Sequence, residues 1–273
     1  MNLATTGLQK PANTALDEVP LAVEVQGLNV SFGDSHVLKN VSVRVKANGV
    51  VGLVGESGSG KSTLGKTLVG INVPDSGSIR IGGLDLAGIS RSERARMRRE
   101  IQYIPQDPYS SLSPRRTTGQ TLAEALDPVR SDPRKYKREI AEVLECVKLD
   151  AAAADKYPHE FSGGQRQRIA IARALILNPK VIIADEITSA LDVSVQAEIV
   201  RLLRELRGNM DSAMLFISHN LAVTQQVCDE VVVMFQGRIV EHGPIDDVYG
   251  NPQHEYTQKL LSSLPGSPGF TLD

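Results

Sequence analysis

Short apolar runs alternate with helical segments along most of the chain, and turn residues separate them. Residues 21–30 and 41–45 alternate apolar and polar side chains, which predicts strands of a half-buried β layer. The runs 50–54, 181–184 and 213–217 are almost wholly apolar, as is typical of parallel strands that are buried on both faces. Strands that alternate with helices predict a mainly parallel α/β sheet, preceded here by an antiparallel β layer.

The segment from about 107 to 178 differs from the rest, because its pattern is helical and contains no strand. Ile140 and Leu144 lie on one apolar helical face, and Asn178-Pro179 ends the last helix. We therefore expect a helical subdomain inserted into the sheet. Further strands are predicted at 79–81, 101–104, 231–235 and 238–240, and further helices at 64–69, 166–177, 193–207, 245–249 and 254–261.

Length and composition indicate a soluble protein with either one large domain or a core with a subdomain. The chain has 273 residues, 41% of them hydrophobic, and a formal net charge of -2. No apolar run approaches the ~18–20 residues of a membrane-spanning helix, and the first residues lack the apolar core of a signal peptide. Cys146 and Cys228 are far apart and show no metal-ligand spacing, which favours buried thiols in a reducing compartment over a disulfide framework. We expect a disordered tail over 1–20, a main domain over 21–245 and a short helical extension over 246–273.

Five arginines lie within residues 91–99, so a nucleic-acid interface is one interpretation of this run. Glu93 and Glu100 lie within and just after the run, and no aromatic residues interleave with it. A solvated helix face with local ion pairs is the favoured interpretation.

The strongest chemical motif lies between the apolar run 50–54 and the helix predicted at 64–69. Strand, glycine loop and helix in this order predict a phosphate-binding loop. Glycines let the backbone approach a ligand closely, so that successive N–H groups form an anion nest beside a helix N-terminus. We expect Lys61 to reach the β- and γ-phosphates and Ser62 to bind Mg²⁺; the alternative is a glycine turn with an incidental lysine. The predicted nucleotide-binding residues of the loop are Gly55, Glu56, Ser57, Gly58, Ser59, Gly60, Lys61, Ser62 and Thr63.

Polar residues follow three more strands, at the strand ends where ligand sites of α/β sheets collect. Asp185 ends a buried strand and is expected to hold Mg²⁺ together with Ser62. Glu186 is the candidate general base for an attacking water, and His219 is expected to hydrogen-bond the γ-phosphate. Gln106 offers an amide oxygen to Mg²⁺ or water. The alternative for Asp185 and Glu186 is a solvated turn after the strand. For His219 it is a structural role, and for Gln106 it is an ordinary polar position in a loop.

The order of these motifs resembles the nucleotide-binding subunit of an ABC transporter, from about Leu21 to the end of the chain. Two more stretches carry the resemblance, Ser162-Gly163-Gly164-Gln165 and Ser189-Ala190-Leu191-Asp192. The Ser-Gly-Gly-Gln signature is the most specific element, because other phosphate-loop ATPases lack it. A Ser-Gly-Gly turn that opens a helix is also a second anion site on physical grounds.

The resemblance implies a head-to-tail dimer, in which each ATP lies between one subunit's phosphate loop and the other subunit's signature. The residues from Ser162 to Gln165 would then touch the γ-phosphate that the partner binds. Asp192 would line the dimer seam, and Phe32 would stack on adenine. Gln106 would couple the nucleotide site to a membrane subunit docked beside the helical insert.

Within this family, the chain is most similar to peptide and nickel importers. The likeness is carried by the stretches 157–161, 192–196 and 251–257. Ile187 stands where these importers usually have a proline, and loss of a fixed φ could loosen the loop that carries Glu186. The C-terminal stretch has no cysteine, so we predict no iron–sulfur cluster.

The resemblance implies an ATP-hydrolysing subunit, with ATP and Mg²⁺, that powers a membrane importer for oligopeptides, dipeptides or a related small solute. The expected partners are transmembrane permease subunits, a second identical or related ABC ATPase and, indirectly, an extracytoplasmic solute-binding protein, but no nucleic acid. The expected location is peripheral, on the cytoplasmic face of the inner or plasma membrane. The alternatives are a nickel importer ATPase, a non-hydrolysing interaction subunit, and a soluble ABC ATPase that acts on nucleic acid or ribosomes. Against the last, the chain has one cassette, no sustained heptads and no excess of basic charge.

Overall fold

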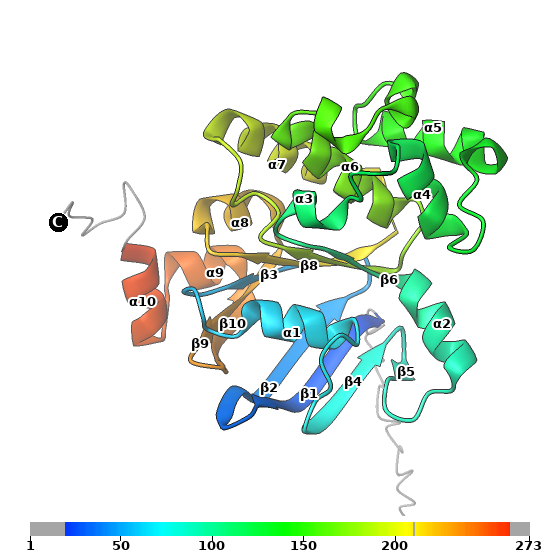
Figure 1. The fold of residues 1–273 in the computed structure, drawn as a ribbon. Coiled ribbons are helices and arrows are strands. Elements are labelled where there is room, and N and C mark those ends of the chain that lie inside the picture. The colour runs from blue at the N-terminus through cyan, green and yellow to red at the C-terminus, as the bar shows by residue number, and fades with distance from the viewer. Residues whose placement is uncertain (1–19, 210, 263–273) are drawn as a thin grey trace, which may run out of the picture.

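The computed structural model describes residues 20–209 and 211–262, and it stacks two β-sheets with helices around them (Figure 1). The larger sheet has six strands, which are parallel except for one edge strand that is antiparallel to its neighbour. The spatial order is β10 (Arg238–Pro244), β9 (Glu230–Phe235), β3 (Val50–Val54), β8 (Ala213–Ser218), β7 (Val181–Asp185) and β6 (Ile101–Ile104). The mainly parallel sheet predicted from the apolar runs is therefore confirmed.

The N-terminal β layer is a separate four-stranded antiparallel sheet, as its alternating pattern predicts. Its two long strands bury every second residue over much of their length, because one face packs on the core and the other faces outward. The spatial order is β2 (Ser35–Lys46), β1 (Leu21–Phe32), β4 (Ser76–Ile81) and β5 (Leu84–Asp85).

Helices lie on both faces of the six-stranded sheet (Figure 1). α1 (Lys61–Leu68) packs closely between the two sheets, since a Cβ placed on Gly65 would lie 2.9 Å from Ile217 Cδ1. No helix within 20–209 and 211–262 is long and apolar enough to cross a membrane. The remaining helices are α2 (Arg91–Glu100), α3 (Pro108–Ser111), α4 (Thr118–Leu126), α5 (Lys137–Cys146), α6 (Gly163–Leu175), α7 (Val193–Asn209), α8 (Leu221–Val227), α9 (Ile245–Gly250) and α10 (Glu255–Ser262), with 3₁₀ turns at Pro133–Tyr136, Ala151–Asp155 and Pro158–Glu160.

The six-stranded sheet separates two hydrophobic cores. Successive residues of a strand point to opposite faces, so Ile182 of β7 packs under the helices α4 to α8, whereas Ile183 packs toward α1 and the four-stranded sheet. The segment between β6 and β7 contains helices and no strand, as predicted, and its two flanking strands pair side by side.

Several elements differ from the sequence-based expectations. α6 begins at Gly163 and ends at Leu175, whereas the pattern predicted a helix over 166–177; the capping side chain of Ser162 starts the helix three residues earlier. The short elements α3, α8 and β5 were not predicted, because seven or fewer residues carry little periodicity. The tail predicted over 1–20 lies outside the described residues, apart from its last residue.

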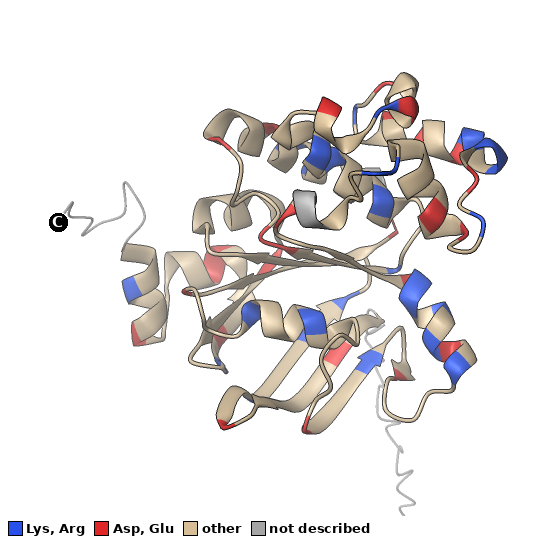
Figure 2. Ribbon diagram, viewed as in Figure 1, with Lys and Arg blue, Asp and Glu red and all other residues tan. Residues whose placement is uncertain are grey.

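The arginine-rich run forms α2, where basic side chains alternate with other residues along the helix (Figure 2). Met97 is its one buried residue, while the arginines are exposed and Arg96 pairs with Glu100 at 3.1 Å. A reciprocal capping box between Ser90 and Glu93 starts the helix. The prediction of a solvated helix face with local ion pairs is confirmed.

Candidate active site

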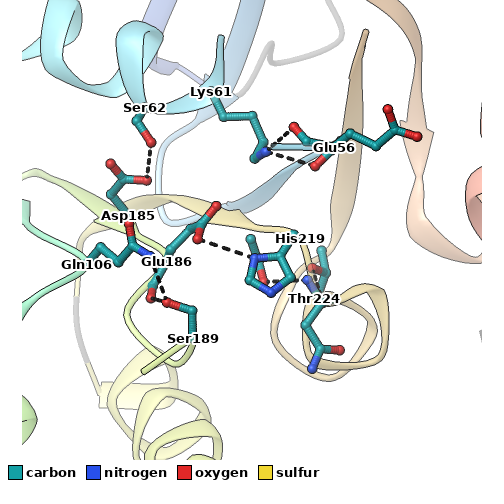
Figure 3. Close-up of polar contacts among 12 residues, drawn as sticks. Glu56, Lys61, Ser62, Gln106, Asp185, Glu186, Ser189, His219 and Thr224 are labelled. Carbon is teal, nitrogen blue, oxygen red and sulfur yellow. Dashed lines mark hydrogen bonds and ion pairs between the residues drawn. The ribbon is translucent and has the colours of Figure 1, made fainter. Parts of the chain in front are cut away.

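Four neighbouring parallel strands end at one edge of the six-stranded sheet, and each is followed by a predicted site residue. β3 leads into the phosphate loop, β8 into His219, β7 into Asp185 and Glu186, and β6 into Gln106. The register pairs Val54 with Ser218 and Asp185 with Ile217, so the strands end at nearly the same level. The predicted residues of these four segments therefore converge, as Figure 3 shows.

The glycines of the phosphate loop adopt conformations that other residues rarely take. Gly55, Gly58 and Gly60 have φ values of 151°, 80° and 109°. A Cβ on Gly55 would also lie only 2.1 Å from the Met234 carbonyl oxygen, so the loop passes directly against the end of β9. The loop backbone is thus fixed by both torsion and close packing, as a preformed anion nest requires.

Lys61 starts α1 at the base of this loop. Its ammonium donates hydrogen bonds to the carbonyl oxygens of Gly55 and Glu56, both at 2.8 Å (Figure 3). Burial lowers the pKa of the Lys61 ammonium, while the carboxylates of Glu186 and Asp185 act in the opposite direction. Gly60 occupies the N-cap of α1 without any side-chain cap, so the helix N-terminus is open to an anion.

Asp185 receives hydrogen bonds on both carboxylate oxygens. Ser62 Oγ donates to Oδ1 at 3.0 Å, and the Tyr103 hydroxyl donates to Oδ2 at 2.6 Å. Burial raises the pKa of the Asp185 carboxyl, and these two hydrogen bonds oppose the rise. Sequence reasoning predicted the pair of Asp185 and Ser62 but missed Tyr103, which lies inside β6.

The donor set of Ser62 and Asp185 fits Mg²⁺, because a hydroxyl and a carboxylate oxygen are hard ligands and already lie in contact. Among residues 20–209 and 211–262, no group of three or more His, Cys, Asp and Glu side chains is placed to hold a metal ion. A site of this kind suits Mg²⁺, which uses one or two protein carboxylates and takes its other ligands from phosphates and water.

Glu186 points away from Asp185 because the chain turns between them. Its φ is 48°, a left-handed conformation that is uncommon outside glycine. The turn is held by the Glu186 carbonyl oxygen, which accepts hydrogen bonds from both the amide and the hydroxyl of Ser189. The carboxylate then lies 3.3 Å from Nδ1 of His219, and its side chain is only 15% exposed against 56% for the histidine.

Ile187 is buried, with 1% of its surface exposed, in the core beneath the helices. The loop that carries Glu186 therefore has an apolar anchor on one side and two hydrogen bonds on the other. These contacts restrain the loop and oppose the loosening that we predicted from the absence of a proline at position 187.

Gln106 lies beside this turn, where its Nε2 donates to Ser189 Oγ at 3.2 Å (Figure 3). Its role toward Mg²⁺ or water stays a prediction. Phe32 is the last residue of β1 and is half exposed, as an adenine platform would need to be, and its role also stays a prediction.

The signature residues form the start of α6 and not a wall of the phosphate loop. Ser162 Oγ accepts from the Gln165 amide, and Gln165 Oε1 accepts from the Ser162 amide, which makes a capping box. Gly164 packs on α7, since a Cβ there would lie 2.4 Å from Val195 Cγ1. Asp192 caps α7 by accepting hydrogen bonds from Ser194 Oγ and the Val195 amide.

Comparison with known proteins identifies the family. The ABC transporter family profile matches residues 38–189. A Brucella ovis protein provisionally named a peptide import ATP-binding protein is 50% identical over 255 residues, which cover 92% of this chain and 80% of the relative. The di/tripeptide transport ATP-binding protein DppF of Pseudomonas aeruginosa is 46% identical over 241 residues, which cover 88% of this chain and 75% of the relative.

Solved structures agree with the sequence comparison. CbiO1 of Clostridium perfringens, part of the ABC transporter complex CbiONQ, superposes with a TM-score of 0.77 at 29% identity and covers 85% of this chain and 92% of its own. The dimeric ATP-binding cassette MJ0796, bound to ADP and phosphate in a post-hydrolysis state, gives a TM-score of 0.70 at 26% identity and covers 82% and 98%. The chain therefore belongs to the ABC transporter family, among its ATP-binding subunits.

Proposed function

We propose that this chain hydrolyses ATP to power a membrane importer of oligopeptides, dipeptides or a related small solute. The observation that carries the proposal is the convergence of the phosphate loop, Asp185, Glu186 and His219 at one edge of the sheet. The substrate class rests on the relatives, whose names refer to peptide import and to di/tripeptide transport.

The side chains divide the chemistry among themselves. Lys61 and the loop amides bind the phosphates, and His219 contacts the γ-phosphate. Glu186 accepts a proton from the attacking water. The water oxygen forms a bond to the γ-phosphorus, and the bond from the γ-phosphorus to the β–γ bridging oxygen breaks. Ser62, Asp185 and Gln106 would hold Mg²⁺, which neutralises phosphate charge when bound.

A second ABC ATPase completes the site in this proposal. Ser162 and Gln165 are exposed at the start of α6, where the side-chain oxygen of each accepts a hydrogen bond from the backbone amide of the other. The residues 162–165 are thus available to the γ-phosphate held by a partner, with Asp192 at the seam and Phe32 against adenine. The dimeric relative bound to ADP and phosphate supports this arrangement.

As part of an importer, this chain would have further partners and would lie at a membrane. Permease subunits would dock beside the helical subdomain over about 107–178, with Gln106 as the coupling residue, at the cytoplasmic face of the membrane. A solute-binding protein would act from the other side. The main domain would span 21–245, with 246–273 as a helical extension. We expect no iron–sulfur cluster in this chain, because two cysteines are too few for the usual four thiolate ligands.

A nickel importer ATPase is the second candidate, and a soluble ABC ATPase that acts on nucleic acid or ribosomes is the third. Gentle detergent purification of the tagged chain, followed by mass spectrometry, separates the three. Two multi-helix membrane proteins, a second ATPase and a solute-binding protein with bound peptide would support the proposal. Bound nickel would favour the second candidate. Ribosomal or DNA-associated proteins without a membrane partner would overturn the importer and leave the ATPase chemistry.

A further inference from the structure

The C-terminal helix α10 touches the phosphate loop through one tyrosine. The Tyr256 hydroxyl accepts a hydrogen bond of 2.9 Å from the backbone N–H of Glu56, a residue 200 positions earlier in the chain. Tyr256 is buried, with 7% of its surface exposed, and burial raises the pKa of its phenol, so the hydroxyl stays neutral at physiological pH. The contact is therefore a direct bridge from the end of the chain to the nucleotide-binding loop.

The ring of Tyr256 is held in place from the side of β9. It stacks on Phe235, the last residue of β9, with ring centroids 4.1 Å apart and an interplanar angle of 28°. Two residues later, the Gly237 amide donates to the Ser59 carbonyl oxygen at 2.9 Å. The turn after β9 and Tyr256 of α10 thus hydrogen-bond to the phosphate loop at two residues, Ser59 and Glu56.

The start of α10 is itself fixed by hydrogen bonds. The carboxylate of Glu241 in β10 accepts from the amides of Gln253 and His254, at 2.7 and 3.0 Å. Nδ1 of His254 then accepts from the amide of Tyr256 at 3.1 Å. The position of the tyrosine is therefore set by the six-stranded sheet and not by a free tail.

The peptide unit between Gly55 and Glu56, whose N–H contacts Tyr256, also contacts the predicted phosphate-binding lysine, because its Gly55 carbonyl oxygen accepts a hydrogen bond from the Lys61 ammonium at 2.8 Å. The Glu56 carbonyl oxygen accepts from the Lys61 ammonium at 2.8 Å and from the Ser59 amide at 3.2 Å (Figure 3). A hydrogen bond to the Glu56 N–H thus restricts the backbone on which Lys61 rests. Without an acceptor, this N–H would lose its partner and the loop would gain conformational freedom.

We propose that α10 positions the phosphate loop for ATP through Tyr256, which makes Tyr256 a positioning residue in nucleotide binding. The proposal rests on the proposed ATPase function. It predicts a change in ATP affinity rather than in the hydrolysis step, because Tyr256 contacts neither Glu186 nor Asp185.

Tyr256→Phe tests the proposal, since it keeps the ring and its stacking and removes only the acceptor. Loss of a hydrogen bond that contributes about 0.5–1.5 kcal/mol corresponds to a roughly two- to tenfold weaker ATP Kd. We expect that increase, with kcat at saturating ATP near that of the wild type. In the nucleotide-free protein, we expect faster hydrogen exchange in the peptide that contains Glu56.

Tyr249→Phe is the matched control, because its hydroxyl contacts the Leu221 carbonyl oxygen and not the loop. Equal ATP affinity and equal amide exchange in the two variants would overturn the proposal and leave the ATPase function standing. A wild-type protein that binds no ATP would instead reject the proposed function, and the exchange measurement would still decide whether Tyr256 holds the loop.

Discussion

Asp185 and Glu186 are adjacent in sequence but face different neighbours. The left-handed φ of Glu186 turns the chain, so that Asp185 contacts Ser62 and Tyr103 while Glu186 approaches His219. In the proposed mechanism, this arrangement places Asp185 on the Mg²⁺ side of the site and leaves Glu186 for proton transfer. The sequence motif names both acids, but only the backbone torsion separates their roles.

Replacement of Glu186 by Gln removes the proposed general base and keeps nearly the same shape. We expect ATP binding to persist while turnover falls by about 10²- to 10⁴-fold, because the amide cannot accept the proton. Single-turnover hydrolysis and equilibrium binding of ATP measure the two effects separately. Glu139→Gln, an exposed substitution on α5, serves as the control. Turnover that stays near the wild-type rate would remove Glu186 from the mechanism.

Replacement of Tyr103 by Phe removes one of the two donors to Asp185. The ring should still pack beside Gly65, where Tyr103 Cε2 would lie 3.6 Å from a Cβ. We expect the carboxylate to be less well fixed and Mn²⁺, as a probe for Mg²⁺, to bind roughly two- to tenfold more weakly in the presence of nucleotide. Electron paramagnetic resonance titration measures this directly. Tyr136→Phe on the helical side is the control, and equal Mn²⁺ affinity in both variants would contradict the expectation.

At the scale of elements, the beginning of α6 rests directly on the beginning of α7. Gly164 leaves room for Val195, while Asp192 caps α7 and Ser162 caps α6. The capped ends keep the signature in place, because each helix is fixed at the residue where it starts. The Gly-Gly pair thus has a packing requirement at its second position as well as a predicted anion-binding role.

Gly164→Ala would place a methyl group 2.4 Å from Val195 Cγ1. We expect a loss of about 1–3 kcal/mol in the free energy of unfolding, because valine is stiff and the start of α6 must shift. Urea denaturation measures the loss, and Val195→Ala in the same chain should recover part of it. Gly163→Ala is the matched control, since its methyl group would meet only Leu191 Cδ2 at an ordinary 3.8 Å. Equal free energies of unfolding for the two alanine variants would show that Val195 moves aside without a measurable loss of stability.

At the scale of the whole molecule, the six-stranded sheet separates two hydrophobic cores that exclude solvent. Cys228 lies in the helix-side core, where its Sγ would be 3.1 Å from a Cβ on Gly52 of β3. Burial raises the pKa of the Cys228 thiol, so the prediction of buried thiols is confirmed for this residue. It is wrong for Cys146, which is exposed because it ends α5 away from the buried face of that helix. The two thiols therefore report on different events, one on the surface and one on the opening of the core.

Thiol labelling at pH 8 should separate these events. A raised pKa keeps Cys228 protonated until well above this pH, and the packing excludes reagent, so it should react at least about a hundredfold more slowly than Cys146. In Cys146→Ser, labelling by a coloured disulfide reagent should follow unfolding in urea. Rapid native-state labelling of Cys228 would mean that the core opens locally.

The sequence allowed prediction of those features that depend on neighbouring residues. Apolar runs located the strands, and the polar residue after each strand located the site. The contacts of Tyr103 with Asp185 and of Tyr256 with Glu56 join residues 82 and 200 positions apart, and no local pattern encodes such a pairing. α8 was missed although Asn220 caps it, because its seven residues are too few for a clear helical period.

The register of β7 limits the insertions and deletions that the chain can tolerate. Ile182 and Ile183 belong to opposite cores, and Asp185 faces Ser62 only while this alternation holds. One added residue within β7 would exchange the two isoleucines between cores and turn the carboxylate to the other face of the sheet. Insertions and deletions among related sequences should therefore be absent from β7 and occur in surface segments such as 86–90, between β5 and α2.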